Sequence, residues 1–240
     1  MVAICPPTLT NGVTSSVEST AVGPGSSDGT GGLTAPRPVA NMVMPSPGVD
    51  PRNWQPGDSC ATLTLQSRHA HMETITIRPW QLDDKPALLR YGNNRNVWVN
   101  LTDIFPHPYT PDDADRWLWR CGAQQQAHTN MAIEFAGEAI GATGIELKQD
   151  VYRKSADIGY WLGEPYWGRG FATCALRLMT DYAFANFDIT RLQASVFEWN
   201  PASARVLEKC GYKFEARLRQ RIFKDSRYAD ELIYTRLRGE

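Results

Sequence analysis

The sequence lacks the features that assign a chain to several large classes of protein. It has no run of about 18 apolar residues, so no segment is expected to span a membrane. A formal net charge of −1 over 240 residues argues against a large nucleic-acid-binding surface. The 5 cysteines form no CxxC pair and no Cys/His cluster with metal-ligand spacing, so no metal is expected. Scattered cysteines are typical of reduced thiols, and we therefore expect a cytoplasmic protein.

Regular patterning is missing from residues 1–71. Gly, Pro, Ser and Thr dominate this stretch, as in GPGSSDGTGG, and neither helical nor strand periodicity is present. Such a composition buries too little apolar surface to offset the entropy of ordering the chain, so we predict a disordered tail. It has no basic start leading into an apolar core, and no arginine precedes Arg37, which argues against secretory and mitochondrial targeting. Met72 is a candidate translation start, a hypothesis that tryptic peptides from residues 1–60 would refute.

Residues 72–240 carry equal numbers of acidic and basic side chains and are long enough for one core. Alternating apolar residues predict strands, and apolar residues at helical spacing predict helices. The order of these elements predicts an α/β or α+β domain with a mixed sheet and helices on its faces. The predicted strands are 74–78, 130–136, 139–148, 155–162, 191–197, 212–223 and 229–237, and the predicted helices are 83–91, 111–125, 168–187 and 201–209. A loop is expected over 93–110.

The stretch WGRGFAT, residues 167–173, joins a predicted strand to a predicted helix. It lacks the GxxxxGK[ST] pattern of a P-loop, and it fails the dinucleotide pattern because Thr173 occupies the last position. It also lacks a Ser, Thr, Asp or Asn residue directly before the helix, so no side chain is expected to cap the first amides. Glycines let an anion approach such open amides. Taken alone, the stretch is equally compatible with an ordinary turn whose amides are bound by water.

Two sequence motifs, one of which contains this turn, together indicate what the turn binds. SADIGYWLGEPYWGRGFATCALRLM, followed by NPASARVLEKCGY, resembles the GNAT superfamily of acetyl-CoA-dependent N-acetyltransferases. The family's Q/R-x-x-G-x-G/A motif is met from Trp167 to Ala172, although Trp167 stands where many members have Gln or Arg. Asn200, Gly211 and Tyr212 match a second motif. NLTDIFPHPYT and KDSRYADELIYTRLR are similar to the branch that includes the ribosomal-protein N-terminal (alanine) acetyltransferases.

The resemblance implies a mostly antiparallel sheet, with helices on both faces, that is splayed between its fourth and fifth strands. It further implies that the pyrophosphate of acetyl-CoA, the co-substrate, binds the amides that open the helix. Arg169 either adds charge there or is an ordinary surface arginine. Asn200 caps the following helix and also contacts the cofactor arm. The implied cofactor-binding residues are Tyr160, Trp161, Leu162, Trp167, Gly168, Arg169, Gly170, Phe171, Ala172, Thr173 and Asn200.

The implied chemistry is direct attack of an amine on a thioester. An α-amine has a pKa near 8 and is mostly charged at neutral pH, so a general base helps. The leaving thiolate needs a proton. Many relatives supply it from a tyrosine seven residues after the Asn, but this chain has Leu207 there. Ser203, which relatives of this branch share, is the substitute candidate; the alternative is a helix-start serine without chemistry.

The base candidates are Asp157 and Glu146, with Glu134 a third choice; each of them has a structural alternative. The loop NLTDIFPHPYT is expected over the acceptor entrance, with Asn100, Phe105 and Tyr109 as candidate acceptor contacts. The implied function is acetyl transfer to the N-terminal amine of a protein or peptide. A small amine such as an antibiotic or polyamine is the alternative acceptor, and a catalytically silent coenzyme A-binding module is the alternative function.

Overall fold

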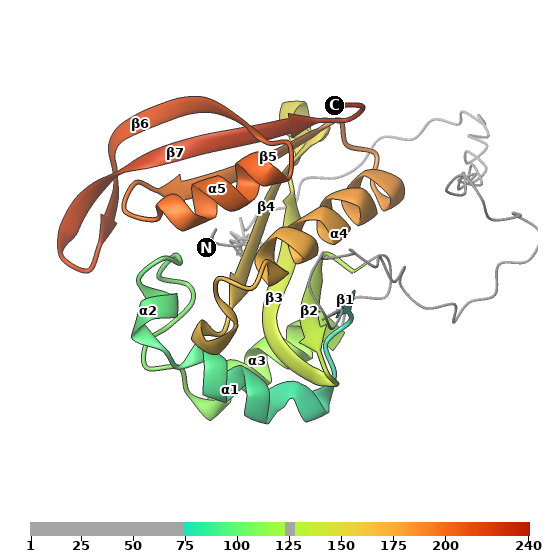
Figure 1. The fold of residues 1–240 in the computed structure, drawn as a ribbon, viewed down its shortest axis with the longest axis vertical. Coiled ribbons are helices and arrows are strands. Elements are labelled where there is room, and N and C mark those ends of the chain that lie inside the picture. The colour runs from blue at the N-terminus through green and yellow to red at the C-terminus, as the bar shows by residue number, and fades with distance from the viewer. Residues whose placement is uncertain (1–73, 123–127) are drawn as a thin grey trace, which may run out of the picture. The chain divides into compact units, whose positions relative to one another are not determined.

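The computed structural model describes residues 74–122 and 128–240 (Figure 1). The predicted tail, residues 1–71, lies outside the described residues, and so does Gln125, the predicted end of a helix. The strands are β1 (Ile75–Arg78), β2 (Asn130–Phe135), β3 (Glu138–Leu147), β4 (Ser155–Leu162), β5 (Arg191–Phe197), β6 (Lys213–Lys224) and β7 (Arg227–Leu237). The α-helices are α1 (Lys85–Gly92), α2 (Arg95–Trp98), α3 (Pro111–Gly122), α4 (Phe171–Asn186) and α5 (Pro201–Lys209).

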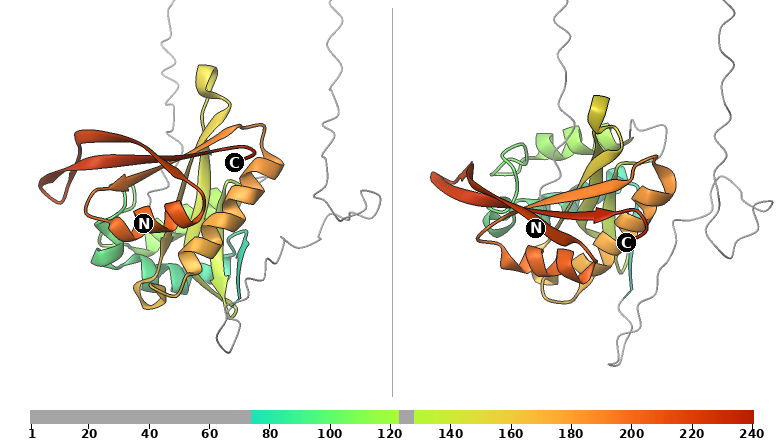
Figure 2. Two further views of the ribbon diagram at one scale, coloured as in Figure 1. Left: turned by 45° about the horizontal axis from the view of Figure 1, so that its top comes forward. Right: turned by 90° about the horizontal axis from the view of Figure 1, so that it is seen from above.

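The described strands form one sheet in the order β1-β2-β3-β4-β5-β7-β6. Neighbouring strands run antiparallel except β4 and β5, which run parallel. The predicted mixed, mostly antiparallel sheet is therefore confirmed. The long β6–β7 hairpin extends beyond the rest of the sheet, as Figure 2 shows.

The sheet is covered on both faces. On one face, α4 and α5 bury a core that includes Ile158 and Tyr160 of β4. On the other face, α1 and α3 bury a second core that includes Trp161. Because successive side chains of a strand point to opposite faces, Tyr160 and Trp161 of β4 belong to different cores. The predicted arrangement of helices on both faces is confirmed.

The parallel pairing of β4 and β5 is short. Backbone partners are found only from Ser155 to Asp157 on β4, opposite Arg191 to Gln193 on β5. Beyond these pairs, β4 continues to Leu162 beside β3, whereas β5 continues to Phe197 beside β7. The sheet therefore opens between its fourth and fifth strands, as predicted. The gap exposes strand edges with backbone groups that can pair with a ligand.

One α-helix was not predicted from the sequence. The expected loop over 93–110 contains the single-turn helix α2, Arg95–Trp98. Asn94 forms this turn, because its side-chain oxygen accepts hydrogen bonds from the backbone N–H groups of Asn96 and Val97. Val97 is fully buried and so anchors the turn in the second core. Four residues are too few to show helical periodicity in a sequence, which is why a loop was expected.

Candidate active site

A cavity of about 290 Å³ lies between the end of β4, the start of α4 and the first turns of α5. Its walls come from segments about 40 residues apart in sequence, which the open region of the sheet brings together. The lining residues are Asn100, Tyr160, Leu162, Tyr166, Trp167, Gly168, Gly170, Phe171, Ala172, Thr173, Asn200, Ala202, Ser203, Arg205, Val206 and Lys209. We call this the β4–α5 cavity.

The glycine turn forms one end of the β4–α5 cavity. Gly168 and Gly170 have φ values of 77° and 84°, in the left-handed region that L side chains rarely adopt. A Cβ atom at either position would meet nothing within 4 Å, so the backbone conformation, and not crowding, requires glycine here. Helix α4 begins at Phe171 without a side-chain cap from Gly170. Its first amides therefore have no helical or capping partner and are available to an anion.

Most of the predicted cofactor-binding residues line this cavity. They are Tyr160, Leu162, Trp167, Gly168, Gly170, Phe171, Ala172, Thr173 and Asn200. Trp167 is fixed by its indole N–H, which donates to the carbonyl oxygen of Leu162 at 2.8 Å. Two predicted residues lie elsewhere. Trp161 faces the opposite side of the sheet, and the guanidinium of Arg169 lies 4.6 Å from the centre of the Phe171 ring and 5.0 Å from that of Phe135.

Ser203 and Tyr160 meet in the wall of the cavity. The phenolic oxygen of Tyr160 lies 2.8 Å from Ser203 Oγ, and both residues are buried. Burial raises the pKa of Tyr160, so the phenol stays neutral and keeps its proton for hydrogen bonding. Leu207, which occupies the position of the tyrosine of many relatives, is fully buried in the first core. Tyr160 was predicted only to contact the cofactor arm. The contact of its hydroxyl with Ser203 was not predicted.

Asn200 holds the start of α5. Its side-chain oxygen accepts a hydrogen bond from the backbone N–H of Ser203 at 3.2 Å, and Pro201 occupies the first helical position. The predicted N-cap is confirmed. This cap fixes the first turn of α5, and therefore the direction in which Ser203 points. Two cations that the sequence analysis passed over, Arg205 and Lys209, follow on the same helix at a spacing of four residues and line the cavity.

The candidate bases Asp157 and Glu146 lie directly opposite each other on β4 and β3. Lys148 Nζ is 2.6 Å from an Asp157 oxygen and 3.9 Å from a Glu146 oxygen. Neither carboxylate lines the β4–α5 cavity. Asp157 is nevertheless the last residue of β4 that pairs with β5, so it stands where the gap between the strands begins.

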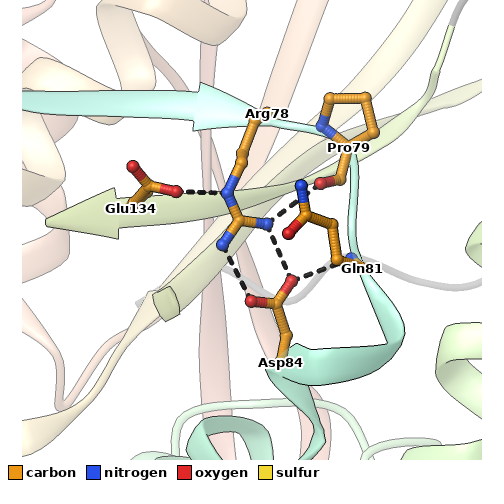
Figure 3. A network of polar contacts seen from close by, with 5 residues as sticks. All are labelled: Arg78, Pro79, Gln81, Asp84 and Glu134. Atoms are coloured by element: carbon orange, nitrogen blue, oxygen red, sulfur yellow. Dashed lines mark hydrogen bonds and ion pairs between the residues drawn. The ribbon is translucent and has the colours of Figure 1, made fainter. Parts of the chain in front are cut away.

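The third candidate base, Glu134, belongs to a different cluster. Arg78 of β1 donates hydrogen bonds to the carboxylates of Asp84 and Glu134, and Figure 3 shows its guanidinium between them. The contact with Asp84, followed by that with Glu134, raises the pKa of Arg78 despite partial burial. This cluster ties β1 to β2 and to the turn before α1, which favours a structural role for Glu134.

A second cavity, of about 230 Å³, contains two of the predicted acceptor contacts, Phe105 and Tyr109. The third, Asn100, lines the β4–α5 cavity instead. We call this second cavity the α3 cavity, because Arg116, Trp117 and Arg120 of α3 form part of its wall. These three residues were not predicted to line a site, although the sequence places them at i, i+1 and i+4 of a predicted helix. Its remaining lining residues are Leu88, Leu101, Thr102, Ile104, Pro106, Asp113 and Trp161.

Residues 74–122 and 128–240 contain neither a candidate membrane-spanning helix nor a candidate metal-binding cluster. None of the helices there has the length and apolar character needed to cross a membrane. The same residues contain no group of three or more His, Cys, Asp or Glu side chains placed to hold a metal ion.

Comparison with known proteins agrees with this geometry. The sequence model of the acetyltransferase (GNAT) domain matches residues 74–213. The Bacillus subtilis (strain 168) protein YjcK, named as a probable N-acetyltransferase, is 41% identical over 156 residues, which cover 62% of this chain and 86% of YjcK.

Two solved structures share the fold. A spermidine N-acetyltransferase from Vibrio cholerae, in complex with CoA and spermine, superimposes with a TM-score of 0.59 at 22% identity, covering 69% of this chain and 96% of that one. RimL, a ribosomal L7/L12 alpha-N-protein acetyltransferase in complex with coenzyme A, superimposes with a TM-score of 0.60 at 20% identity, covering 68% of this chain and 93% of that one. The chain therefore belongs to the acetyltransferase (GNAT) family and is an acetyl-CoA-dependent N-acetyltransferase.

Proposed function

We propose that this enzyme acetylates the N-terminal α-amine of a protein or peptide. The observation that carries the acetyl-transfer chemistry is the β4–α5 cavity, in which an uncapped helix start and the buried Tyr160–Ser203 pair line one space. The choice of acceptor follows the resemblance of NLTDIFPHPYT and KDSRYADELIYTRLR to the ribosomal-protein N-terminal acetyltransferases. The uncapped start is suited to bind an anion, and the hydroxyl pair is suited to supply a proton. The domain that contains this cavity, residues 72–240, is proposed to be the catalytic unit.

The β4–α5 cavity offers acetyl-CoA open amides, positive charge and a strand edge. The first amides of α4, from Phe171 to Thr173, are the proposed ligands of the pyrophosphate. Arg205 and Lys209 supply positive charge along α5 for the same polyanionic molecule. The edge of β4 from Tyr160 to Leu162 has no partner on β5, so it offers backbone groups to the amide-containing arm of the cofactor. When bound there, acetyl-CoA supplies a thioester that an amine can attack.

Ser203 is the proposed proton donor to the departing sulfur. Ser203 is one of the lining residues of the cavity, and its hydroxyl lies within hydrogen-bond distance of Tyr160. The neutral phenol of Tyr160 is a positioning group, because it can donate to Ser203 Oγ and leave the serine proton directed at the cavity. In this proposal the buried Tyr160–Ser203 pair supplies the proton that many relatives take from a tyrosine at the position of Leu207.

Asp157 is the preferred candidate for the base that takes a proton from the attacking amine. It stands at the closed end of the gap, where β4 and β5 begin to separate, whereas Glu146 lies one strand further from the gap. Asp157→Asn is expected to lower kcat/KM at pH 7 and to regain activity as the pH rises above about 8, where an α-amine deprotonates by itself. Glu146→Gln is the matched control. If Glu146→Gln alone gave that pH profile, the two roles would be exchanged.

A thiol-release assay tests the function directly. Purified full-length protein is given acetyl-CoA and a panel of peptides, polyamines and aminoglycosides, and acetyl-CoA affinity is measured separately. Release of thiol with peptides that carry a free N-terminus, and none with N-formylated copies, would support the proposal. Turnover with spermidine alone would favour the polyamine acceptor. Tight acetyl-CoA binding without turnover would favour the silent module, for which the replacement of tyrosine by Leu207 is the specific indication.

A further inference from the structure

The α3 cavity lies on the opposite face of β4 from the β4–α5 cavity. Tyr160 lines one and Trp161 lines the other, and these two residues are neighbours on the same strand. The segment after α2 also separates the two spaces, because Asn100 lines the β4–α5 cavity while Leu101 and Thr102 line the α3 cavity. The backbone of β4 and of the segment after α2 therefore forms a wall that the two cavities share.

Four of the twelve residues that line the α3 cavity are aromatic. The Phe105 ring stacks on Tyr109 with ring centres 4.8 Å apart and meets Trp161 edge-on at 5.6 Å. Trp117 of α3 contributes a further aromatic side chain to the lining. With about 230 Å³, the space is smaller than the roughly 300–1,000 Å³ of a site for a drug-sized ligand. It is suited to one large apolar side chain and not to a long linear molecule.

The charge of this cavity is positive. Its single carboxylate, Asp113, already accepts hydrogen bonds from Arg116, from the backbone N–H of Thr110 and from the Thr110 hydroxyl. Arg120 has no carboxylate partner among the described residues; its guanidinium lies 5.3 Å from the centre of the Trp117 ring. A polyamine would have to place its ammonium groups beside these cations, which costs free energy. A carboxylate would be attracted to Arg120.

We propose that the α3 cavity selects the acceptor and that it takes a peptide N-terminus with an aromatic first residue followed by an acidic residue. The inference rests on the proposed function. The aromatic side chain fills the space between Phe105, Trp117 and Trp161, and the acidic residue that follows pairs with Arg120. The amine then extends past Asn100 toward the gap between β4 and β5.

Peptide binding, measured by calorimetry in the presence of CoA, tests this selectivity without requiring turnover. The probes are the tetrapeptides Phe-Asp-Ala-Ala, Phe-Lys-Ala-Ala and Gly-Asp-Ala-Ala, together with spermidine. We expect Phe-Asp-Ala-Ala to bind at least tenfold more tightly than each of the other probes. Equal affinity for the Asp and Lys peptides, or tighter binding of spermidine, would overturn the proposal.

Arg120→Glu provides the second measurement. This variant is expected to reverse the order of the Asp and Lys peptides while its affinity for acetyl-CoA stays at the wild-type value. Arg153→Glu, at an exposed arginine that lines neither cavity, is the matched control and is expected to keep the wild-type order. An unchanged order in Arg120→Glu would refute the role of Arg120. If Phe-Asp-Ala-Ala binds as expected but no thiol is released, the selectivity of the α3 cavity is supported and the proposed acetyl transfer to peptides is refuted.

Discussion

The hydroxyl of Tyr160 lies 2.8 Å from that of Ser203, and this hydrogen bond joins β4 to α5 across the opening of the sheet. Ser203→Ala removes the proposed proton donor. We expect kcat to fall by about 10²-fold, the lower end of the range for general acid catalysis, with little change in the KM for acetyl-CoA. Steady-state kinetics with the best acceptor of the panel would measure both constants. An unchanged kcat would remove the role of Ser203 as an acid.

A double-mutant cycle separates the roles of the two hydroxyls. Tyr160→Phe should lower kcat by less than Ser203→Ala, because it removes only the group that orients the serine proton. The variant with both substitutions should be no slower than Ser203→Ala alone, since residues that act as a unit are not additive. Additive losses would show that Tyr160 acts independently of Ser203.

The glycine turn gives a prediction about cofactor affinity. Gly170→Glu is expected to weaken acetyl-CoA binding by more than 100-fold, because it adds a carboxylate where a pyrophosphate is proposed to bind. Gly137→Glu is the matched control: Gly137 has a φ of 82°, close to the 84° of Gly170, and a Cβ there also meets nothing within 4 Å. Both variants thus acquire similar strain and the same charge. Equal affinities for acetyl-CoA would refute the pyrophosphate site.

The glycine turn and the cap of α5 could be predicted because both depend on short stretches of sequence. The helix start without a side-chain cap at Gly170, and the cap at Asn200, follow from residue types at neighbouring positions. The Tyr160–Ser203 contact could not be predicted, since it joins residues 43 positions apart and depends on how β4 and α5 pack. The position of the Arg169 side chain could not be predicted for a similar reason, because three aromatic rings from different elements surround its guanidinium.

The α3 cavity was beyond sequence reasoning for a different reason. Arg116, Trp117 and Arg120 form a pattern that fits any exposed helix face, and a helix face becomes a wall only when another segment covers it. That segment is the stretch around Phe105, which carried no regular periodicity. Fold class was accessible from the sequence because it depends on the order of many elements, whereas this cavity depends on one long connection.

The β6–β7 hairpin gives a prediction about stability. Lys224 has a side chain that is only 2% exposed, pairs with Asp103 at 2.6 Å and lies 3.6 Å from the centre of the Trp98 ring. Asp103→Ala leaves this ammonium buried without its carboxylate, and we expect a loss of about 1–3 kcal/mol in urea unfolding. Adding Lys224→Met should recover part of that loss, because the buried charge is then gone while the stem still packs.

An exposed ion pair is the control for that measurement. Lys213 pairs with Glu240 at 2.6 Å, but its side chain is 69% exposed. Glu240→Ala should therefore lower the free energy of unfolding much less than Asp103→Ala does. If Asp103→Ala were no more destabilising than Glu240→Ala, the Lys224–Asp103 pair would not stabilise the contact of the hairpin with the segment that follows α2.

Tyr212 gives a prediction about alkaline stability. Burial raises the pKa of Tyr212 above its ordinary value of 10.0, and its hydroxyl lies 2.8 Å from that of Thr180. Above pH 10 the unfolded chain loses this proton and the folded protein keeps it, so stability falls as the pH rises, by up to about 1.4 kcal/mol per pH unit for each such group. Tyr212→Phe should reduce that slope in urea titrations between pH 10 and 11.5, and Tyr152→Phe, at an exposed tyrosine, controls for the loss of a hydroxyl. Identical slopes for the wild type and Tyr212→Phe would show that Tyr212 is not protected from ionisation by the core.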